Sequence, residues 1–140
     1  MKYARVISMI AAILSLVALP ALAELRTTAH ATGDVIIGDQ VVMTIRATAG
    51  GMSIQQRVDQ VTARVNKLLG IAKLDSKLMT ITKVGADYTV SYNGDLLATA
   101  DSKTASLDGM TTMKLANQWA ANLLRVIPLA QAKPSNPPHQ

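Results

Sequence analysis

The sequence predicts a small α+β domain of two layers, in which two helices pack on one face of a mainly antiparallel sheet. Three observations predict this fold. Two stretches carry apolar residues at helical spacing along one side, tight-turn signals join several short β-rich stretches, and the segments follow in the order strand pair, helix, three-stranded meander, helix. Because each helix has one apolar stripe and the meander has one apolar face, two layers are enough to bury them all.

The strand pair is predicted around Gly38-Asp39, a Gly-first two-residue connection suited to a tight hairpin. The preceding strand contains Val35–Ile37. In the following strand, alternation puts Val41, Met43 and Ile45 on one face, and Val42, Thr44 and Arg46 on the other. This pattern is typical of a half-buried strand.

The first helix is predicted to begin after Ser53, because Gln56 stands three residues later at capping-box spacing. Its apolar stripe comprises Ile54, Val58, Val61, Val65, Leu68 and Leu69. Its polar side comprises Arg57, Asp59, Gln60, Arg64 and Lys67. Gly70 stands where a left-handed residue closes many helices. We therefore expect a surface helix that buries one face on the sheet.

The meander is predicted from Leu78 to Ala100, and its turns predict its register. A type I′ turn at Asn93-Gly94 places Tyr92 opposite Asp95, Val90 opposite Leu97 and Tyr88 opposite Thr99, and a type II′ turn at Gly85-Ala86 pairs Val84 with Asp87. Directly opposed residues share a face of the sheet. The residues that share the apolar face are then Met79, Ile81, Val90, Tyr92 and Leu97.

Asp101–Gly109 is polar and rich in turn residues, which predicts a connection without regular structure. A second helix is predicted from about Thr112, whose hydroxyl can cap it, to Ile127. Its stripe contains Leu115, Trp119, Leu123 and Ile127, so Trp119 is expected in the core. Pro128 is expected to end this helix, and residues 129–140 are expected to form a disordered Pro-rich tail.

The first 23 residues resemble a cleavable signal peptide: two positive charges precede an uncharged apolar run, and Ala21-Leu22-Ala23 supplies small residues before Glu24. We expect cleavage after Ala23, a flexible leading segment at residues 24–33, and a single domain at residues 34–128. Since the chain has no Cys, it needs no disulfides, and no cysteine is present to carry a lipid anchor. The expected location is the bacterial periplasm.

Composition argues against nucleic acid as a partner. The formal net charge is +5 with 14 Lys and Arg. Removal of the signal peptide takes away Lys2 and Arg5, which leaves 12 basic and 9 acidic residues and a net charge of +3. The remaining basic residues are scattered, there is no Phe and only one Trp, and so the basic stripe with stacking aromatics is missing.

No set of catalytic or metal-ligating residues is visible in the sequence, so we expect no enzyme, no metal and no cofactor. His30 and His139 lie in segments expected to be flexible, and no Gly-x-Ser-x-Gly motif occurs. One alternative remains open, a small hydrolase that uses the turn carboxylates Asp95 and Asp101.

The sequence suggests two candidate contact surfaces. The first is the glycine-containing turn before the first helix, with Gly50, Gly51 and Arg57. The second is the hairpin turn formed by Asn93, Gly94 and Asp95.

Two parts of the chain also suggest a family. Ile37–Ile45 followed by Ser53–Val58, and later Leu97–Asp101 followed by Leu115–Leu123, resemble motifs of a soluble extracytoplasmic domain. That domain precedes the membrane helices in some bacterial small-conductance mechanosensitive channels. The resemblance spans about residues 35–127 and implies a stand-alone copy of an accessory module. Channel activity is not implied, because nothing hydrophobic follows Ala132.

These observations favour a non-enzymatic periplasmic binding module of the envelope, with an envelope or membrane protein as its partner. The alternatives are the carboxylate hydrolase and a structural protein that self-associates into homo-oligomers through unpaired sheet edges.

Overall fold

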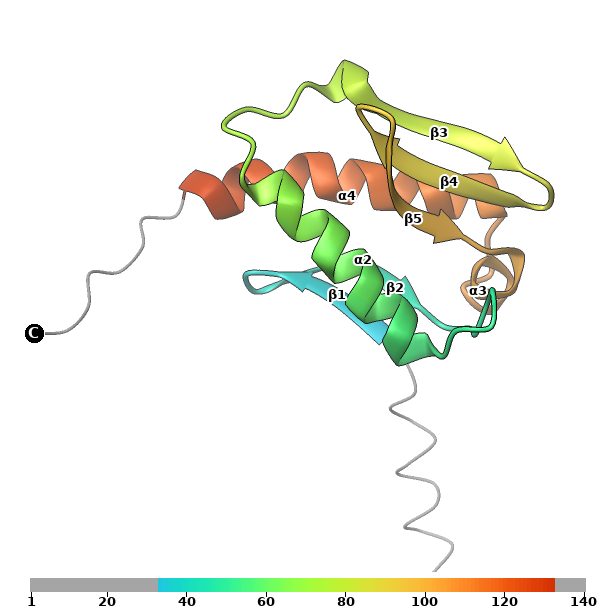
Figure 1. Ribbon diagram of the computed structural model, residues 1–140. Helices are drawn as coiled ribbons and strands as arrows, with labels where there is room; N and C mark the ends of the chain where they lie inside the picture. The colour runs from blue at the N-terminus through green and yellow to red at the C-terminus, as the bar shows by residue number, and fades with distance from the viewer. Residues whose placement is uncertain (1–32, 133–140) are drawn as a thin grey trace, which may run out of the picture. The chain divides into compact units, whose positions relative to one another are not determined.

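The computed structural model describes residues 33–132, which form an α+β fold in the predicted order of elements (Figure 1). The α+β class and this order are confirmed. The signal peptide, the cleavage after Ala23, residues 24–32 of the leading segment and residues 133–140 of the Pro-rich tail lie outside the described residues.

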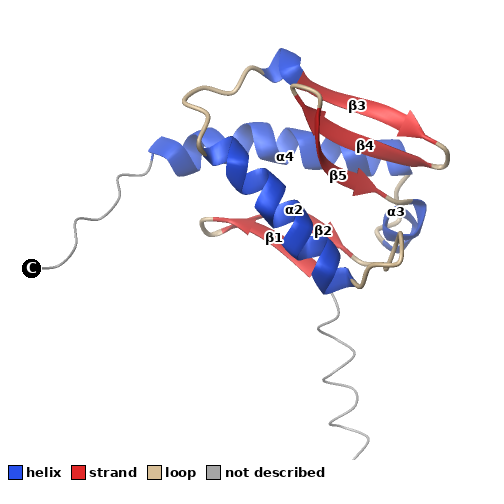
Figure 2. Cartoon of the chain, viewed as in Figure 1, coloured by secondary structure: helices blue, strands red, loops and turns tan. Residues whose placement is uncertain are grey.

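The strands form two separate antiparallel sheets, whereas the sequence predicted one. The first sheet pairs β1 (Gly33–Ile37) with β2 (Gln40–Ile45), and the second has the order β3 (Met79–Val84), β4 (Asp87–Tyr92), β5 (Asp95–Ala100). Helix α2 (Ile54–Leu69) packs on β1 and β5, and helix α4 (Thr112–Ala132) packs on strands of both sheets (Figure 2). The two helices therefore join the two sheets around one core.

The β1–β2 hairpin turns at Gly38, which has a positive φ of 63°, and it pairs Ile37 with Gln40 as predicted. Its alternation differs from the prediction. A bulge leaves Val42 as an extra residue, because Val35 pairs with Met43 and Ile36 pairs with Val41. Val42 is consequently buried beside Met43, and Val41 is 47% exposed. Gly33, expected in the flexible leading segment, instead opens β1 and is buried.

Helix α2 begins with the predicted capping box: Ser53 Oγ accepts from the N–H of Gln56, and Gln56 Oε1 accepts from the N–H of Ser53. Its end differs from the prediction. Gly70 has a right-handed φ of −79°, because its N–H bonds back to the Lys67 carbonyl in a tight final turn. Arg57, expected on the polar side, is buried at 5% exposure.

In the meander, the β3–β4 register is confirmed, including Val84 opposite Asp87. The Asn93-Gly94 turn has positive φ at both residues, as type I′ requires, and Tyr92 lies opposite Asp95. Further along β5 the predicted register is wrong: Val90 lies opposite Ala98, and Tyr88 lies opposite Ala100.

A bulge at Leu97 causes this shift of one residue in the β4–β5 register. Because the bulge bends β5, Leu97 stays buried, and Ala98 is buried beside it. The predicted apolar face is therefore preserved: Val90, Tyr92 and Leu97 are buried, and Met79 and Ile81 are half-buried.

Asp101–Gly109, predicted to lack regular structure, contains the short helix α3 (Ser102–Leu107). Asp101 is its N-cap, because its Oδ1 accepts from the N–H of Thr104 at 2.8 Å. The cap of α4 is Thr111, not Thr112, since the Thr111 hydroxyl accepts from the N–H of Lys114. A single 3₁₀ turn, η1 (Ser76–Leu78), precedes β3.

Helix α4 runs through Pro128 to Ala132, although Pro128 was expected to end it. Proline removes one backbone donor, but its φ is that of a helix. The last turn is also held from outside, because the Gln131 amide donates to the carbonyls of Leu69 and Ile71. Trp119 is buried at 2% exposure, as predicted. Within residues 33–132, no helix combines the length with the apolar content that a membrane crossing needs.

Candidate functional site

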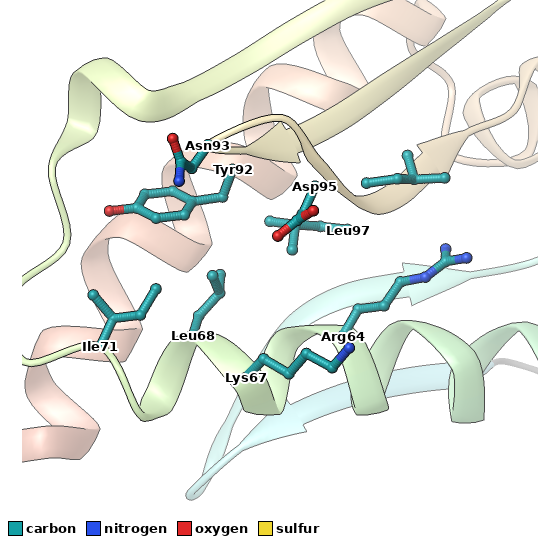
Figure 3. Close-up of a pocket in the computed structure, with 9 residues that line it drawn as sticks. Arg64, Lys67, Leu68, Ile71, Tyr92, Asn93, Asp95 and Leu97 are labelled. Atoms are coloured by element: carbon teal, nitrogen blue, oxygen red, sulfur yellow. The ribbon is translucent and has the colours of Figure 1, made fainter.

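A cavity of about 380 Å³ lies between the C-terminal half of α2 and the β4–β5 hairpin (Figure 3). Small-molecule sites usually occupy about 300–1,000 Å³, so this cavity suits a small ligand. The residues that line it are Arg64, Lys67, Leu68, Ile71, Tyr92, Asn93, Asp95, Leu96 and Leu97.

The floor of the cavity is apolar and firmly held. Leu68, Tyr92 and Leu97 are each at most 5% exposed, and the bulge in β5 places Leu97 there. The Tyr92 hydroxyl accepts from the N–H of Asp75 at 3.0 Å, which ties the loop after α2 to the ring. The floor is therefore part of the folded core and is formed before any ligand binds.

Charged side chains of both signs surround this floor. Arg64 and Lys67 stand three residues apart on α2, a spacing that puts them on the same side of a helix. The Asp95 carboxylate comes from the hairpin on the other side of the cavity (Figure 3). The ion pairs found among residues 33–132 are Arg46–Asp108 and Arg57–Asp101, and neither involves these three side chains.

The structure brings together only part of the predicted contact surfaces. Asn93 and Asp95 line the cavity, and Gly94 is the exposed residue between them. Gly50 and Gly51 lie in the turn before α2, both with positive φ, and they do not line this cavity. Arg57 belongs to neither surface, because it is buried.

Arg57 forms a buried ion pair with Asp101, with 2.8 Å between Nη1 and Oδ2. The guanidinium also donates to the carbonyl of Ala47, just after β2, and to that of Thr99 in β5. Asp101 Oδ2 accepts from the Thr104 hydroxyl at 2.8 Å as well. This arrangement fastens the end of one sheet to the end of the other.

The surroundings of Asp101 lower the pKa of its carboxyl. Burial by itself raises this pKa, but the backbone N–H and the hydroxyl of Thr104 and the Arg57 guanidinium together outweigh it. The carboxylate therefore stays ionised within a set of structural contacts.

The carboxylates of the alternative hydrolase hypothesis do not meet. Asp95 begins β5 and Asp101 follows its end, a separation of about 20 Å at the usual rise of a strand. Glycosidase carboxylates lie about 5–9.5 Å apart. Among residues 33–132 no three His, Cys, Asp or Glu side chains gather closely enough to hold a metal ion, and both histidines lie outside that range.

Sequence reasoning missed the helix side of the cavity. Arg64 and Lys67 were assigned to the solvent-facing side of α2, and no signal identified Leu96 as a wall residue. The usable signal was two cations one turn apart at the edge of the apolar stripe, near its Leu68 end. Their partner across the cavity could not be inferred, because it depends on how the hairpin packs.

The family model described as a domain of unknown function (DUF8459) matches residues 34–129 of the chain. No curated protein and no solved structure matched the chain.

Proposed function

Since this chain belongs to the DUF8459 family of domains of unknown function, we propose its function from its own geometry. The domain is a non-enzymatic binding module of the bacterial envelope, and the cavity between α2 and the β4–β5 hairpin is its ligand site. The observation that carries this proposal is a preformed apolar floor surrounded by charges that make no ion pair with one another.

The chemistry of the lining favours binding over catalysis. A hydroxyl nucleophile is usually activated by a base within hydrogen-bonding distance. In the described residues no hydrogen bond joins two side chains of the lining, and the Tyr92 hydroxyl is already bonded to the backbone of Asp75. Asp101, whose pKa is lowered, is buried in its ion pair and does not line the cavity.

The proposed place of action is the periplasm. This rests on the signal-peptide pattern of residues 1–23. The resemblance to the extracytoplasmic domain of mechanosensitive channels agrees with a ligand or partner in the envelope.

A photocrosslinker in the cavity wall tests the proposal. We expect p-benzoyl-L-phenylalanine at Leu96, a wall residue 38% exposed, to give a reproducible adduct when the exported protein is irradiated in its native cells. The matched control is the same residue at Met113, which is 53% exposed on α4 and outside the cavity. Intact-mass measurement and peptide mapping identify the adducts.

Equal labelling at both positions, or no adduct at Leu96, would contradict a ligand site in the cavity. An adduct at Leu96 with twice the mass of the chain would instead favour self-association.

Self-association remains the second candidate because of one observation. Ile36 and Val41 oppose each other in the two-stranded sheet, and they are 53% and 47% exposed. This apolar pair lies on the β1–β2 hairpin and is not part of the cavity lining. A light-scattering mass equal to one chain at high concentration would remove this alternative.

A further inference from the structure

The two sides of the cavity differ in charge. The α2 side presents Arg64 and Lys67, and the hairpin side presents Asp95 (Figure 3). Between them lies the apolar floor of Leu68, Tyr92 and Leu97. A ligand that satisfies all three parts carries an anion at one end, a cation at the other and an apolar body between them.

The α2 side suits a carboxylate. A guanidinium offers a planar fork that can bond both oxygens of a carboxylate, and a neighbouring ammonium adds a third charged donor. Arg64 is half-buried and Lys67 is exposed, so the first can be held in position while the second can move to the ligand.

The hairpin side suits an ammonium group. Asp95 is exposed beside the type I′ turn, and its carboxylate only accepts hydrogen bonds. Asn93, on the same turn, adds an amide to this side of the cavity. A primary ammonium has three donors to share among such oxygens.

The floor and the volume limit the body of the ligand. A small inorganic anion would leave the apolar floor unused. An anion with only an apolar tail would bring uncharged surface beside Asp95 and make no favourable contact with that carboxylate. The volume of about 380 Å³ is near the lower limit for ligand sites, so the part of the ligand that lies inside the cavity is small.

We propose that the cavity binds a small zwitterion with an apolar body, namely an apolar dipeptide with both termini charged. This inference rests on the proposed function. The inference specifies the chemical class of the ligand: the α2 side binds its carboxylate, and the hairpin side binds its ammonium group.

Four probes test the charge requirement: L-leucyl-L-leucine, N-acetyl-L-leucyl-L-leucine, which lacks the ammonium, L-leucyl-L-leucinamide, which lacks the carboxylate, and free L-leucine, in which both charges sit on one carbon. Backbone amide shifts of the ¹⁵N-labelled mature protein report binding. We expect dileucine to shift the amides of Arg64, Lys67 and Asp95 saturably, and free leucine to bind more weakly. Removal of either charge should weaken binding by about 10-fold or more, as expected for a charge-assisted hydrogen bond.

Asp95→Asn should abolish the preference for the zwitterion over N-acetyl-dileucine, and Arg64→Gln with Lys67→Gln should abolish the preference over dileucinamide. Asp39→Asn is the matched control. Asp39 is also an exposed acid in a hairpin turn, but it lies outside this cavity. The control should bind all four probes as the unaltered protein does.

Binding of N-acetyl-dileucine as tight as that of dileucine, at the same residues, would overturn the zwitterion and leave the ligand site standing. Absence of shifts at the lining residues with all four probes would overturn the inference as well. The crosslinking experiment at Leu96 would then decide separately whether the cavity binds anything.

Discussion

Arg57 and Asp101 carry opposite charges inside the core, and each is 5% exposed. Removing a charged group from water costs several kcal/mol, which is offset only when the partner and further hydrogen bonds are well placed. Here the guanidinium donates to two carbonyls besides Asp101, and Asp101 also accepts from Thr104. Loss of one partner would therefore leave a buried charge without compensation.

Arg57→Met should lower the free energy of unfolding by about 3–5 kcal/mol. The double variant Arg57→Met, Asp101→Asn should lose clearly less than the sum of the two single variants, since neither charge then remains and Asn can still cap α3. Urea denaturation measures all three variants.

The control is the more exposed pair Arg46–Asp108, in which the Arg46 side chain is 38% exposed. Arg46→Gln should cost less than about 1 kcal/mol. Strictly additive losses in the double variant at the buried site would show that Arg57 and Asp101 act independently.

At the scale of the elements, a glycine sets how closely β1 approaches α2. A Cβ on Gly33 would lie 2.4 Å from Val58 Cγ2 and 2.6 Å from Ile54 Cγ2. These atoms belong to the buried face of the helix, so either the strand or the helix would have to shift. The absence of a side chain at Gly33 is therefore what allows β1 to pack here.

Gly33→Ala should cost about 1–3 kcal/mol, the usual penalty for overpacking a core. Gly70→Ala is its control, because Gly70 is right-handed and its nearest non-neighbouring atom is 3.5 Å from the added Cβ. That change should be neutral or stabilise by up to about 1 kcal/mol, since it restricts only the unfolded chain. Thermal melts compare the two, and a large loss in Gly70→Ala would point to a left-handed helix end.

At the scale of the whole molecule, two sheets that share no strand must stay together. Helix α4 contacts both sheets, and Arg57 links the carbonyl of Ala47, just after β2, to that of Thr99, near the end of β5. The charge state of Asp101 thus bears on the packing of the whole domain.

Acid should weaken this link. The pKa of Asp101 is lower in the folded protein than in the unfolded chain. The contribution of Asp101 to the free energy of unfolding is therefore complete above the ordinary aspartate pKa of about 3.9, and it is lost as the pH falls through the lowered value. The Tm of the unaltered protein should therefore exceed that of Asp101→Asn at pH 6. The two should converge as the pH falls from about 4 towards 2. A constant difference over this range would contradict the role given to Asp101.

Local sequence patterns were sufficient to predict the local structure of this protein. The capping box at Ser53, the type I′ turn at Asn93-Gly94 and the apolar stripes of α2 and α4 depend on residues within a few positions of one another. Physical rules of short range are enough for such features, and so the α+β class, the order of elements and the burial of Trp119 were predicted correctly.

The features that join distant segments depend on tertiary packing and could not be predicted from local patterns. The bulges at Val42 and Leu97 follow from how each strand meets the core, and a register read from turns alone assumes that none occur. Arg57 and Asp101 are 44 residues apart, and each by itself looked like a polar surface residue. The cavity likewise exists only because the hairpin with Asn93 and Asp95 packs opposite Arg64 and Lys67. Packing between segments far apart in the chain chose these contacts, since the local pattern of each segment is compatible with many partners.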